Sequence, residues 1–155
     1  MLGDANGNAS QRQGNSIQWS SYNYPTAISA GTGATAETVF LSYGPGRQKL
    51  QQVYTGNGIN ETTQYFGNLL ELVTACGMAD YRHYIYANGR AVAIYSRKSS
   101  GTNTFSYLLT DHQGSVETIA NISGAAVVGE SFTAYGSRRN ATTWSGPAWH
   151  CTAGD

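Results

Sequence analysis

The stretch HYIYANGRAVAIYSR (residues 83–97) decides the fold class of this chain. Bulky and small side chains alternate on both sides of Asn88-Gly89, as strands with two different faces require. Asn-Gly is the preferred pair for a type I′ turn, whose twist matches that of two paired antiparallel strands. The stretch therefore predicts a β-hairpin with strands at 81–86 and 91–96.

Turn-like segments with a glycine recur along the chain at the spacing expected for one hairpin. Successive markers are separated by 21, 22, 25 and 22 residues. The markers are Gly46, Gly67, Gly89, Gly114 and Gly136. Gly7 lies 39 residues before Gly46, which is close to two repeat lengths. The intermediate repeat would then be a degenerate copy of the turn, at 20–29. Such a period is typical of proteins that repeat one supersecondary unit.

The fold class predicted from this period is all-β, with tandem hairpins of about 22 residues. A single hairpin is marginally stable in water, so consecutive hairpins should pair edge to edge. We expect a curved, extended antiparallel sheet that forms a section of a β-shell or β-tube. Further strands are predicted at 105–109, 115–120 and 125–133. The residues expected at repeat turns are Gly46, Gly67, Asn88, Gly89, Asp111, Gly114 and Gly136.

One segment also fits a helix. Its apolar residues Phe66, Leu69, Leu70 and Val73 fall at helical spacing. A strand is favoured, because the segment is short and lies where the repeat requires a strand. Leu70 and Leu72 also fit a period of two. A helix stays the alternative.

Composition excludes several classes of partner. The 155 residues carry no net charge and only 12% are charged, so long-range attraction to nucleic acid or an anionic membrane is not expected. No apolar run approaches the roughly 18 residues of a membrane span, and the start, MLGDANGNAS, lacks the features of a signal peptide. We expect the chain to have been cut or processed from something longer.

The sequence predicts neither a metal site nor a cofactor. His83 and His150 have no second ligand two or four residues away. Cys76 and Cys151 are too few for a disulfide scaffold and lack metal-ligand spacing. They form either one bridge or two buried thiols.

Four segments, taken together and in order, resemble the RHS/YD-repeat family, which includes bacterial toxin-delivery shells. They are FLSYGPGRQKLQQVY (40–54), YRHYIYANGRAVAIYSR (81–97), YLLTDHQGSVETIANISGAAVV (107–128) and SFTAYGSRRNATTWSG (131–146). The resemblance is to the segment that precedes the conserved core domain. It implies a β-ribbon over 1–146, matched weakly in 1–39 and strongly in 40–146, and leaves 147–155 as an irregular tail.

The resemblance also implies a function. Family members use their sheet as a shell, so we expect a non-enzymatic structural scaffold of an exported, extracellular protein. It would form the wall of a shell, tube or fibre that encloses a toxin cargo. The expected partners are further repeats of a parent chain or copies of this chain. Full-length members carry paired aspartates for self-cleavage in a downstream core, and nothing after Gly146 matches it.

Two other functions stay open. In the first, a cell-surface adhesive module stacks glycans on Tyr84 and Tyr86, although tyrosines in strands more often form cross-strand ladders. In the second, a hydrolase uses Ser115 with Asp111 and His112. Adjacent turn residues point in different directions, so we expect Asp111 to accept backbone N–H bonds in an Asx-turn instead.

Two further sets of candidate residues are isolated carboxylates and the asparagines of Asn-x-Ser/Thr triplets. A glycosidase would need two carboxylates brought together by folding, and the candidates are Glu71, Glu117 and Glu130. Four Asn-x-Ser/Thr triplets are candidate glycosylation acceptors, which we interpret mainly as turn residues. They begin at Asn8, Asn60, Asn121 and Asn140.

Overall fold

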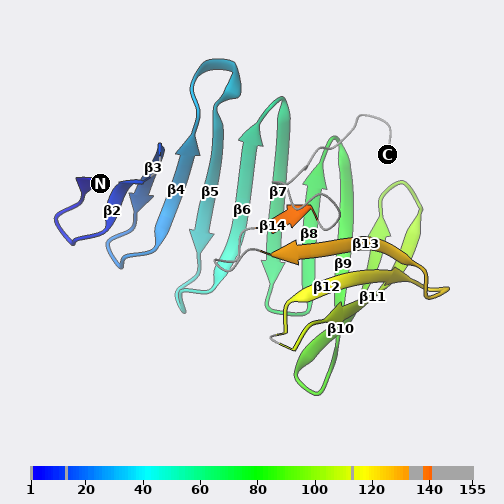
Figure 1. Cartoon of the computed structure of the whole chain (residues 1–155). Coiled ribbons are helices and arrows are strands. Elements are labelled where there is room, and N and C mark those ends of the chain that lie inside the picture. Colours follow the sequence, from blue (N-terminus) through cyan, green and yellow to red (C-terminus); the bar gives the residue numbers. More distant parts are fainter. Residues whose placement is uncertain (1, 13, 113, 133–137, 141–155) are drawn as a thin grey trace. The chain divides into compact units, whose positions relative to one another are not determined.

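The computed structural model describes residues 2–12, 14–112, 114–132 and 138–140, and the side chains only as far as Gly129 (Figure 1). The chain divides into two units, Met1–Ala79 and Asp80–Asp155. In both units every strand is antiparallel to its partner and the strand order is the sequence order. The predicted all-β fold class is confirmed.

The first unit holds eight strands, of which β4 and β5 are joined through the short 3-10 turn η1 (Gly33–Thr35). This turn is the only helical element among the described residues. The strands are β1 (Leu2–Gly3), β2 (Ala9–Arg12), β3 (Asn15–Trp19), β4 (Pro25–Ala30), β5 (Glu37–Tyr43), β6 (Lys49–Gly56), β7 (Ile59–Phe66) and β8 (Leu70–Ala75).

The second unit continues the pattern, beginning with β9, whose first two residues precede the division. Its strands are β9 (Met78–Ala87), β10 (Arg90–Lys98), β11 (Asn103–Thr110), β12 (Val116–Asn121), β13 (Ala126–Phe132) and β14 (Arg138–Asn140). No helix in the described part of the chain is long and apolar enough to cross a membrane.

The hairpin predicted from residues 83–97 is present as β9 and β10. Arg90 lies opposite Ala87, and the two residues between them, Asn88 and Gly89, have φ angles of 50° and 75°. A type I′ turn requires positive φ at both of these positions, which is why Asn-Gly suits it. The register shifts between Ala91 and Ala93, and this shift breaks the simple alternation of the sequence.

The segment at 66–75 contains the end of β7, a turn and all of β8. The prediction of strand is therefore confirmed, and the helical alternative is wrong. β7 ends at Phe66, which lies opposite Leu70 at the start of β8. Of the residues at helical spacing, Phe66 therefore ends one strand, Leu69 lies in the turn, and Leu70 and Val73 lie in the next strand.

Six turns share a second geometry, five residues long. The first N–H donates to the fifth carbonyl, and the fourth N–H donates to the first carbonyl. The fourth residue always has positive φ, as in a type I turn followed by a left-handed residue. The first and fourth residues of the six turns are Asp4 and Gly7, Ser20 and Asn23, Gly44 and Arg47, Lys98 and Gly101, Asp111 and Gly114, and Asn121 and Gly124.

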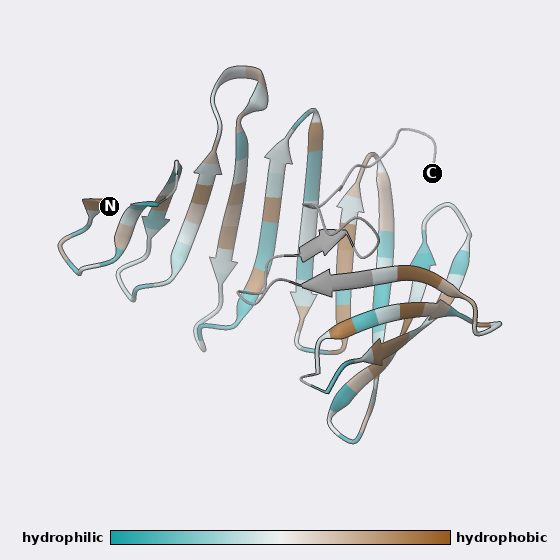
Figure 2. Cartoon of the chain, in the orientation of Figure 1, coloured by the Kyte–Doolittle hydropathy of each residue, from teal (hydrophilic) through white to brown (hydrophobic). Residues whose placement is uncertain are grey.

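Burial is sparse in both units. Few apolar residues are buried, and most of them are alanines. No large side chain among the described residues is fully buried. The core residues are Ala27, Val73, Ala93, Leu108 and Ala120. Large apolar side chains such as Phe40, Phe66 and Leu109 are each more than half exposed, at 51%, 53% and 53%. Figure 2 shows hydrophobic and hydrophilic residues interspersed along the strands. The described strands of each unit thus form one layer, not two packed layers.

The prediction for Cys76 is wrong. It is neither buried nor bridged, but is an exposed free thiol in the two-residue turn between β8 and β9. Cys76-Gly77 lies between the markers Gly67 and Gly89, in the turn that joins β8 to β9. Cys151, His150, Gly136 and the predicted tail at 147–155 lie outside the described residues.

Candidate functional site

The strands of the first unit present two chemically different faces. One face, here named the hydroxyl face, carries a row of uncharged polar residues that lie opposite one another across β3 to β7. The row consists of Ser16, Ser29, Thr38, Thr55 and Asn60. Thr38 Oγ1 donates a hydrogen bond to Ser29 Oγ at 3.2 Å. This face offers hydrogen-bonding groups without formal charge.

The opposite face of the same strands carries carboxylates. Glu37 Oε1 accepts a hydrogen bond of 2.5 Å from Asn57 Nδ2, and Glu61 lies opposite Tyr54. Desolvation raises the pKa of the Tyr54 hydroxyl, and the negative charge of Glu37 acts in the same direction. No group of three metal-ligating side chains occurs among the described residues, so this face holds carboxylates without a metal cluster.

Side chains also connect consecutive hairpins near the β1–β2, β3–β4, β5–β6 and β7–β8 turns. Asn8 Nδ2 donates to Asn23 Oδ1 at 2.9 Å, which joins the β1–β2 turn to the β3–β4 turn. Farther along the same edge of the sheet, Lys49 Nζ at the start of β6 lies 4.1 Å from the ring centroid of Tyr65 in β7. These contacts add to the backbone pairing and fix each hairpin against the next.

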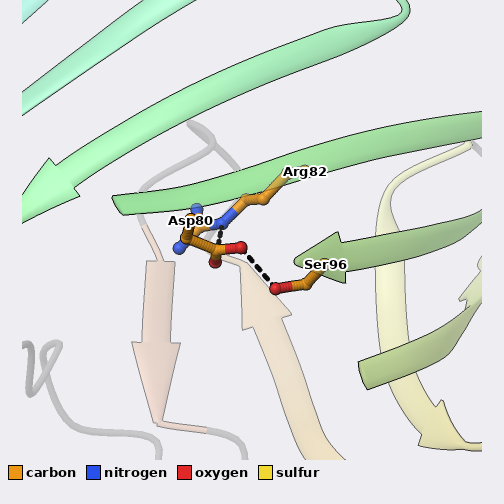
Figure 3. A network of polar contacts seen from close by, with 3 residues as sticks. All are labelled: Asp80, Arg82 and Ser96. Atoms are coloured by element: carbon orange, nitrogen blue, oxygen red, sulfur yellow. Dashed lines mark hydrogen bonds and ion pairs between the residues drawn. The ribbon is translucent and has the colours of Figure 1, made fainter. Parts of the chain in front are cut away.

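In the second unit a polar network joins β9 and β10 (Figure 3). The Asp80 carboxylate accepts hydrogen bonds from Ser96 Oγ and, at 2.9 Å, from Arg82 Nε. Ser96 is only 8% exposed, so its hydroxyl depends on this partner. The network is a structural cross-strand contact that gives a buried hydroxyl its partner.

The candidate glycan-stacking residues lie on one face of β9. Tyr84 lies opposite Ile94, and Tyr86, 42% exposed, lies opposite Ala91 at the turn end of the hairpin. His83 is on the other face, where its ring centroid is 6.3 Å from that of Tyr95. The aromatic residues of this hairpin are therefore divided between the two faces.

The candidate hydrolase residues lie together in the β11–β12 turn, where their contact is structural. The backbone N–H of Ser115 donates to Asp111 Oδ1 at 2.9 Å, and Asp111 N–H donates to Ser115 O at the same distance. His112 is exposed within the turn. The contact that joins Asp111 to Ser115 uses the backbone of the serine, and not its hydroxyl.

The other sequence candidates are dispersed. Two of the glycosylation candidates are hydrogen-bonded in turns: Asn8 Nδ2 donates to Asp4 Oδ2 at 3.0 Å, and Asn121 Oδ1 accepts from the N–H of Ala125, also at 3.0 Å. Asn60 is exposed in β7. Glu71 and Glu117 lie on β8 and β12, and the side chains of Glu130 and Asn140 lie outside the described ones.

No protein-family profile and no curated protein matches the chain. Solved structures do match. A Photorhabdus luminescens Tc holotoxin pore superposes with a TM-score of 0.71 at 17% identity, over 88% of this chain and 7% of that one. The chain has the fold of an RHS-repeat shell segment. The resemblance that the sequence predicted is thereby confirmed at the level of the fold.

Two further Tc structures agree. The complex TcdB2-TccC3 without its hypervariable C-terminal region matches with a TM-score of 0.67 at 16% identity, over 88% of this chain. The complex TcdB2-TccC3-Cdc42 matches with a TM-score of 0.67 at 15% identity, over 81%. In both cases this chain spans 7% of the chain that it matches. The likeness therefore concerns one small segment of a much longer protein.

Proposed function

We propose that the chain is a section of wall in an exported, RHS-like shell, tube or fibre, with a structural and non-enzymatic role. The observation that carries this proposal is the one-layer antiparallel sheet, in strict sequence order, whose fold matches the Tc chains. In a globular enzyme of this size, two packed layers would usually enclose a core that supports a site. A wall needs only a continuous sheet with two accessible faces.

The open edge of the sheet supports a partner that continues it. Among the described strands β1 pairs only with β2, and Leu2 is 61% exposed. An edge strand offers unpaired N–H and C=O groups to further strands. Those strands come from more repeats of a parent protein or from copies of this chain. The five-residue and two-residue turns set the hairpin length, and this is the role we assign to the repeat-turn residues.

The chemistry of the faces supports the enclosure of a cargo. The hydroxyl face carries uncharged hydrogen-bonding groups, and the opposite face carries carboxylates. The hydroxyl row interrupts the apolar surface to which an enclosed polypeptide would adhere, while Ile17, Ile28 and Val39 lie opposite one another on the other face. A toxin domain held behind such a wall would stay unattached to it.

Size-exclusion chromatography with light scattering, followed by negative-stain microscopy, tests this proposal on the purified chain. We expect assemblies larger than one chain, and images of shells, tubes or fibres. Leu2→Lys should weaken assembly by placing a charge on the edge strand. Leu50→Lys, at a 43% exposed leucine inside the sheet, is the control and should assemble normally. A compact monomer that is stable at high dilution contradicts the proposal.

A second candidate function is a glycan-binding adhesive module. The observation that favours it is that Tyr84 and Tyr86 share one face of β9, two residues apart. A glycan array that compares the chain with Tyr84→Ala and Tyr86→Ala separates the two functions. Binding that depends on these tyrosines favours the module, and the absence of binding leaves the scaffold.

A further inference from the structure

Positively charged side chains and tyrosines from three hairpins lie close together at one edge of the first unit. The tyrosine–cation cluster, as we name it, lies near the β3–β4 and β5–β6 turns, at the lower edge of the first unit in Figure 1. Its members are Tyr22, Tyr24, Tyr43, Arg47, Lys49 and Tyr65. Two of their contacts, between Tyr24 and Tyr43 and between Lys49 and Tyr65, hold neighbouring hairpins together. The exposed Arg47 and the partly exposed Tyr22 are left for a further role.

Arg47 stands at a position where this fold otherwise has glycine or asparagine. It is the fourth residue of a five-residue turn, and its φ of 62° lies in the left-handed region. The same position in the other five turns is glycine four times and Asn23 once. A long side chain in this conformation costs free energy that glycine avoids. Turn formation alone therefore does not account for the arginine.

The guanidinium of Arg47 lies over aromatic rings. Its Cζ atom is 5.9 Å from the ring centroid of Tyr22 and 6.0 Å from that of Tyr24. Cation–π contacts at this range hold the guanidinium in place while its N–H groups stay available. Arg47 itself is exposed.

Lys49 supplies a second positive charge in the same region. It lies opposite Tyr43, and its positive charge lowers the pKa of the Tyr43 hydroxyl against the larger, raising effect of burial. Neither Arg47 nor Lys49 forms an ion pair with a carboxylate of any described residue. Two cations are thus presented on tyrosine rings without a negative partner.

The tyrosines under these cations are held rigidly. Tyr43 Oη donates to the carbonyl of Pro25 at 2.9 Å, and the Tyr43 ring meets the Tyr24 ring edge-on. The Tyr22 ring centroid is 5.6 Å from that of Tyr24, and Tyr22 remains 39% exposed. The Tyr22 ring is therefore partly exposed, with the Arg47 guanidinium over it and the Tyr24 ring beside it.

We propose that the tyrosine–cation cluster binds a carboxylated sugar unit, a pyranose that bears a carboxylate. The apolar C–H face of the pyranose stacks on Tyr22, and the carboxylate accepts paired hydrogen bonds from the Arg47 guanidinium. Lys49, which lies over the Tyr65 ring, adds a second positive charge to the cluster. The proposal stands whether or not the chain is part of a shell wall.

The chemistry of the cluster favours this ligand over other anions. A planar guanidinium matches a carboxylate through two parallel hydrogen bonds, and the partly exposed Tyr22 ring provides flat apolar surface for a sugar ring. A nucleic acid would require a broader basic surface than a chain without net charge offers.

Isothermal titration of the full chain with a glucuronic acid-terminated oligosaccharide tests the proposal. The same oligosaccharide ending in glucose is the neutral comparison, and inorganic phosphate and an acidic peptide are the competing anions. We expect the acidic oligosaccharide to bind about tenfold more tightly than the neutral one, because the neutral one has no carboxylate to accept hydrogen bonds from the Arg47 guanidinium. Phosphate and the peptide should bind more weakly than the acidic sugar.

Three variants make the test specific. Arg47→Gly restores the residue that the turn prefers, so it should fold at least as stably while binding falls about tenfold. Tyr22→Leu should weaken binding and Tyr22→Phe should retain it. Arg90→Gln, which removes an exposed arginine beside another turn, is the control and should bind normally.

Several outcomes would overturn the proposal. One is equal binding of the acidic and neutral oligosaccharides, or no binding of either. Another is undiminished binding by Arg47→Gly. Equal binding of phosphate or of the acidic peptide would show a general anion contact and would also reject the sugar.

Discussion

The ring of Tyr24, in the β3–β4 turn, meets the ring of Tyr43, at the end of β5, nearly edge-on, with centroids 5.1 Å apart and planes 78° apart. The two residues belong to different hairpins. Their contact therefore fixes the angle and register between repeats in a way that backbone pairing alone does not. A one-layer sheet depends on such contacts, because it has no deep core to hold its strands.

Replacing Tyr24 with alanine should lower the free energy of unfolding of the first unit. The aromatic pair itself should account for about 1 kcal/mol, measured as the coupling energy in a double-mutant cycle with Tyr43→Ala. Urea unfolding followed by tryptophan fluorescence provides the values. Tyr43→Phe keeps the ring and removes only the hydrogen bond to Pro25 O, so it should cost about 1 kcal/mol without changing the coupling. A coupling near zero would contradict the assigned role of the pair.

Removing Asp80 should destabilise the second unit more than removing Arg82. Asp80→Ala leaves the buried Ser96 hydroxyl without its acceptor, a loss of about 1–3 kcal/mol. Arg82→Ala removes a side chain that is 42% exposed, and exposed ion pairs contribute less than about 1 kcal/mol. Chemical unfolding of the two variants, with Ser96→Ala as a third, gives the comparison. Equal losses for Asp80→Ala and Arg82→Ala would show that Ser96 does not depend on Asp80.

The β1–β2 turn should loosen only in acid. The Asn8 side chain donates to the Asp4 carboxylate and, with backbone N–H groups, holds the pKa of Asp4 below its ordinary value of 3.8. Because the pKa of Asp4 is lower in the folded state, the stabilisation by its carboxylate is present above pH 3.8. It is lost as the pH falls through the pKa that Asp4 has in the folded state. NMR titration of the amides of Asn6 and Asn8 measures this. Asp4→Asn should remove the transition, and a midpoint at or above 3.8 would contradict the assignment.

Replacing Cys76 with asparagine should raise stability. Cys76 has a φ of 51° at the first position of a two-residue turn, where asparagine is better tolerated. We expect a gain of roughly 0.5 kcal/mol in the free energy of unfolding. In the unmodified chain the exposed thiol should react with a maleimide under native conditions about as fast as after unfolding. A protected thiol, or a stability loss in the variant, would show that the turn is held differently.

The fold could be predicted because its determinants are local. Asn88-Gly89 specifies its turn through the φ values of two adjacent residues, and the alternating side chains beside it specify strands. Cys76-Gly77 forms the same kind of turn at the other edge of the sheet. Cysteine is not a typical residue for positive φ, so this turn lacks the usual asparagine signal, whereas Asn57-Gly58 carries that signal and forms such a turn between β6 and β7.

The tyrosine–cation cluster could not be predicted in the same way. Arg47 contacts Tyr22, 25 residues earlier, only because two neighbouring hairpins place their turns side by side. The segment GPGR predicts a turn, but it does not show which residue takes the left-handed position. The alternation predicts that Tyr84 and Tyr86 lie on the face opposite His83, but the pairing of Tyr95 with His83 depends on the register shift near Val92, which the sequence pattern does not predict.

In the shell or tube form that we propose, this sheet is a wall that separates an enclosed space from solvent. Gln51 and Gln52 are adjacent, both half-buried, and lie on opposite faces of β6. In a background of Cys76→Asn and Cys151→Ser, the variants Gln51→Cys and Gln52→Cys should react very differently with a bulky maleimide when the protein is assembled. They should react alike after unfolding. Equal reaction of both cysteines in the assembled protein would contradict the account.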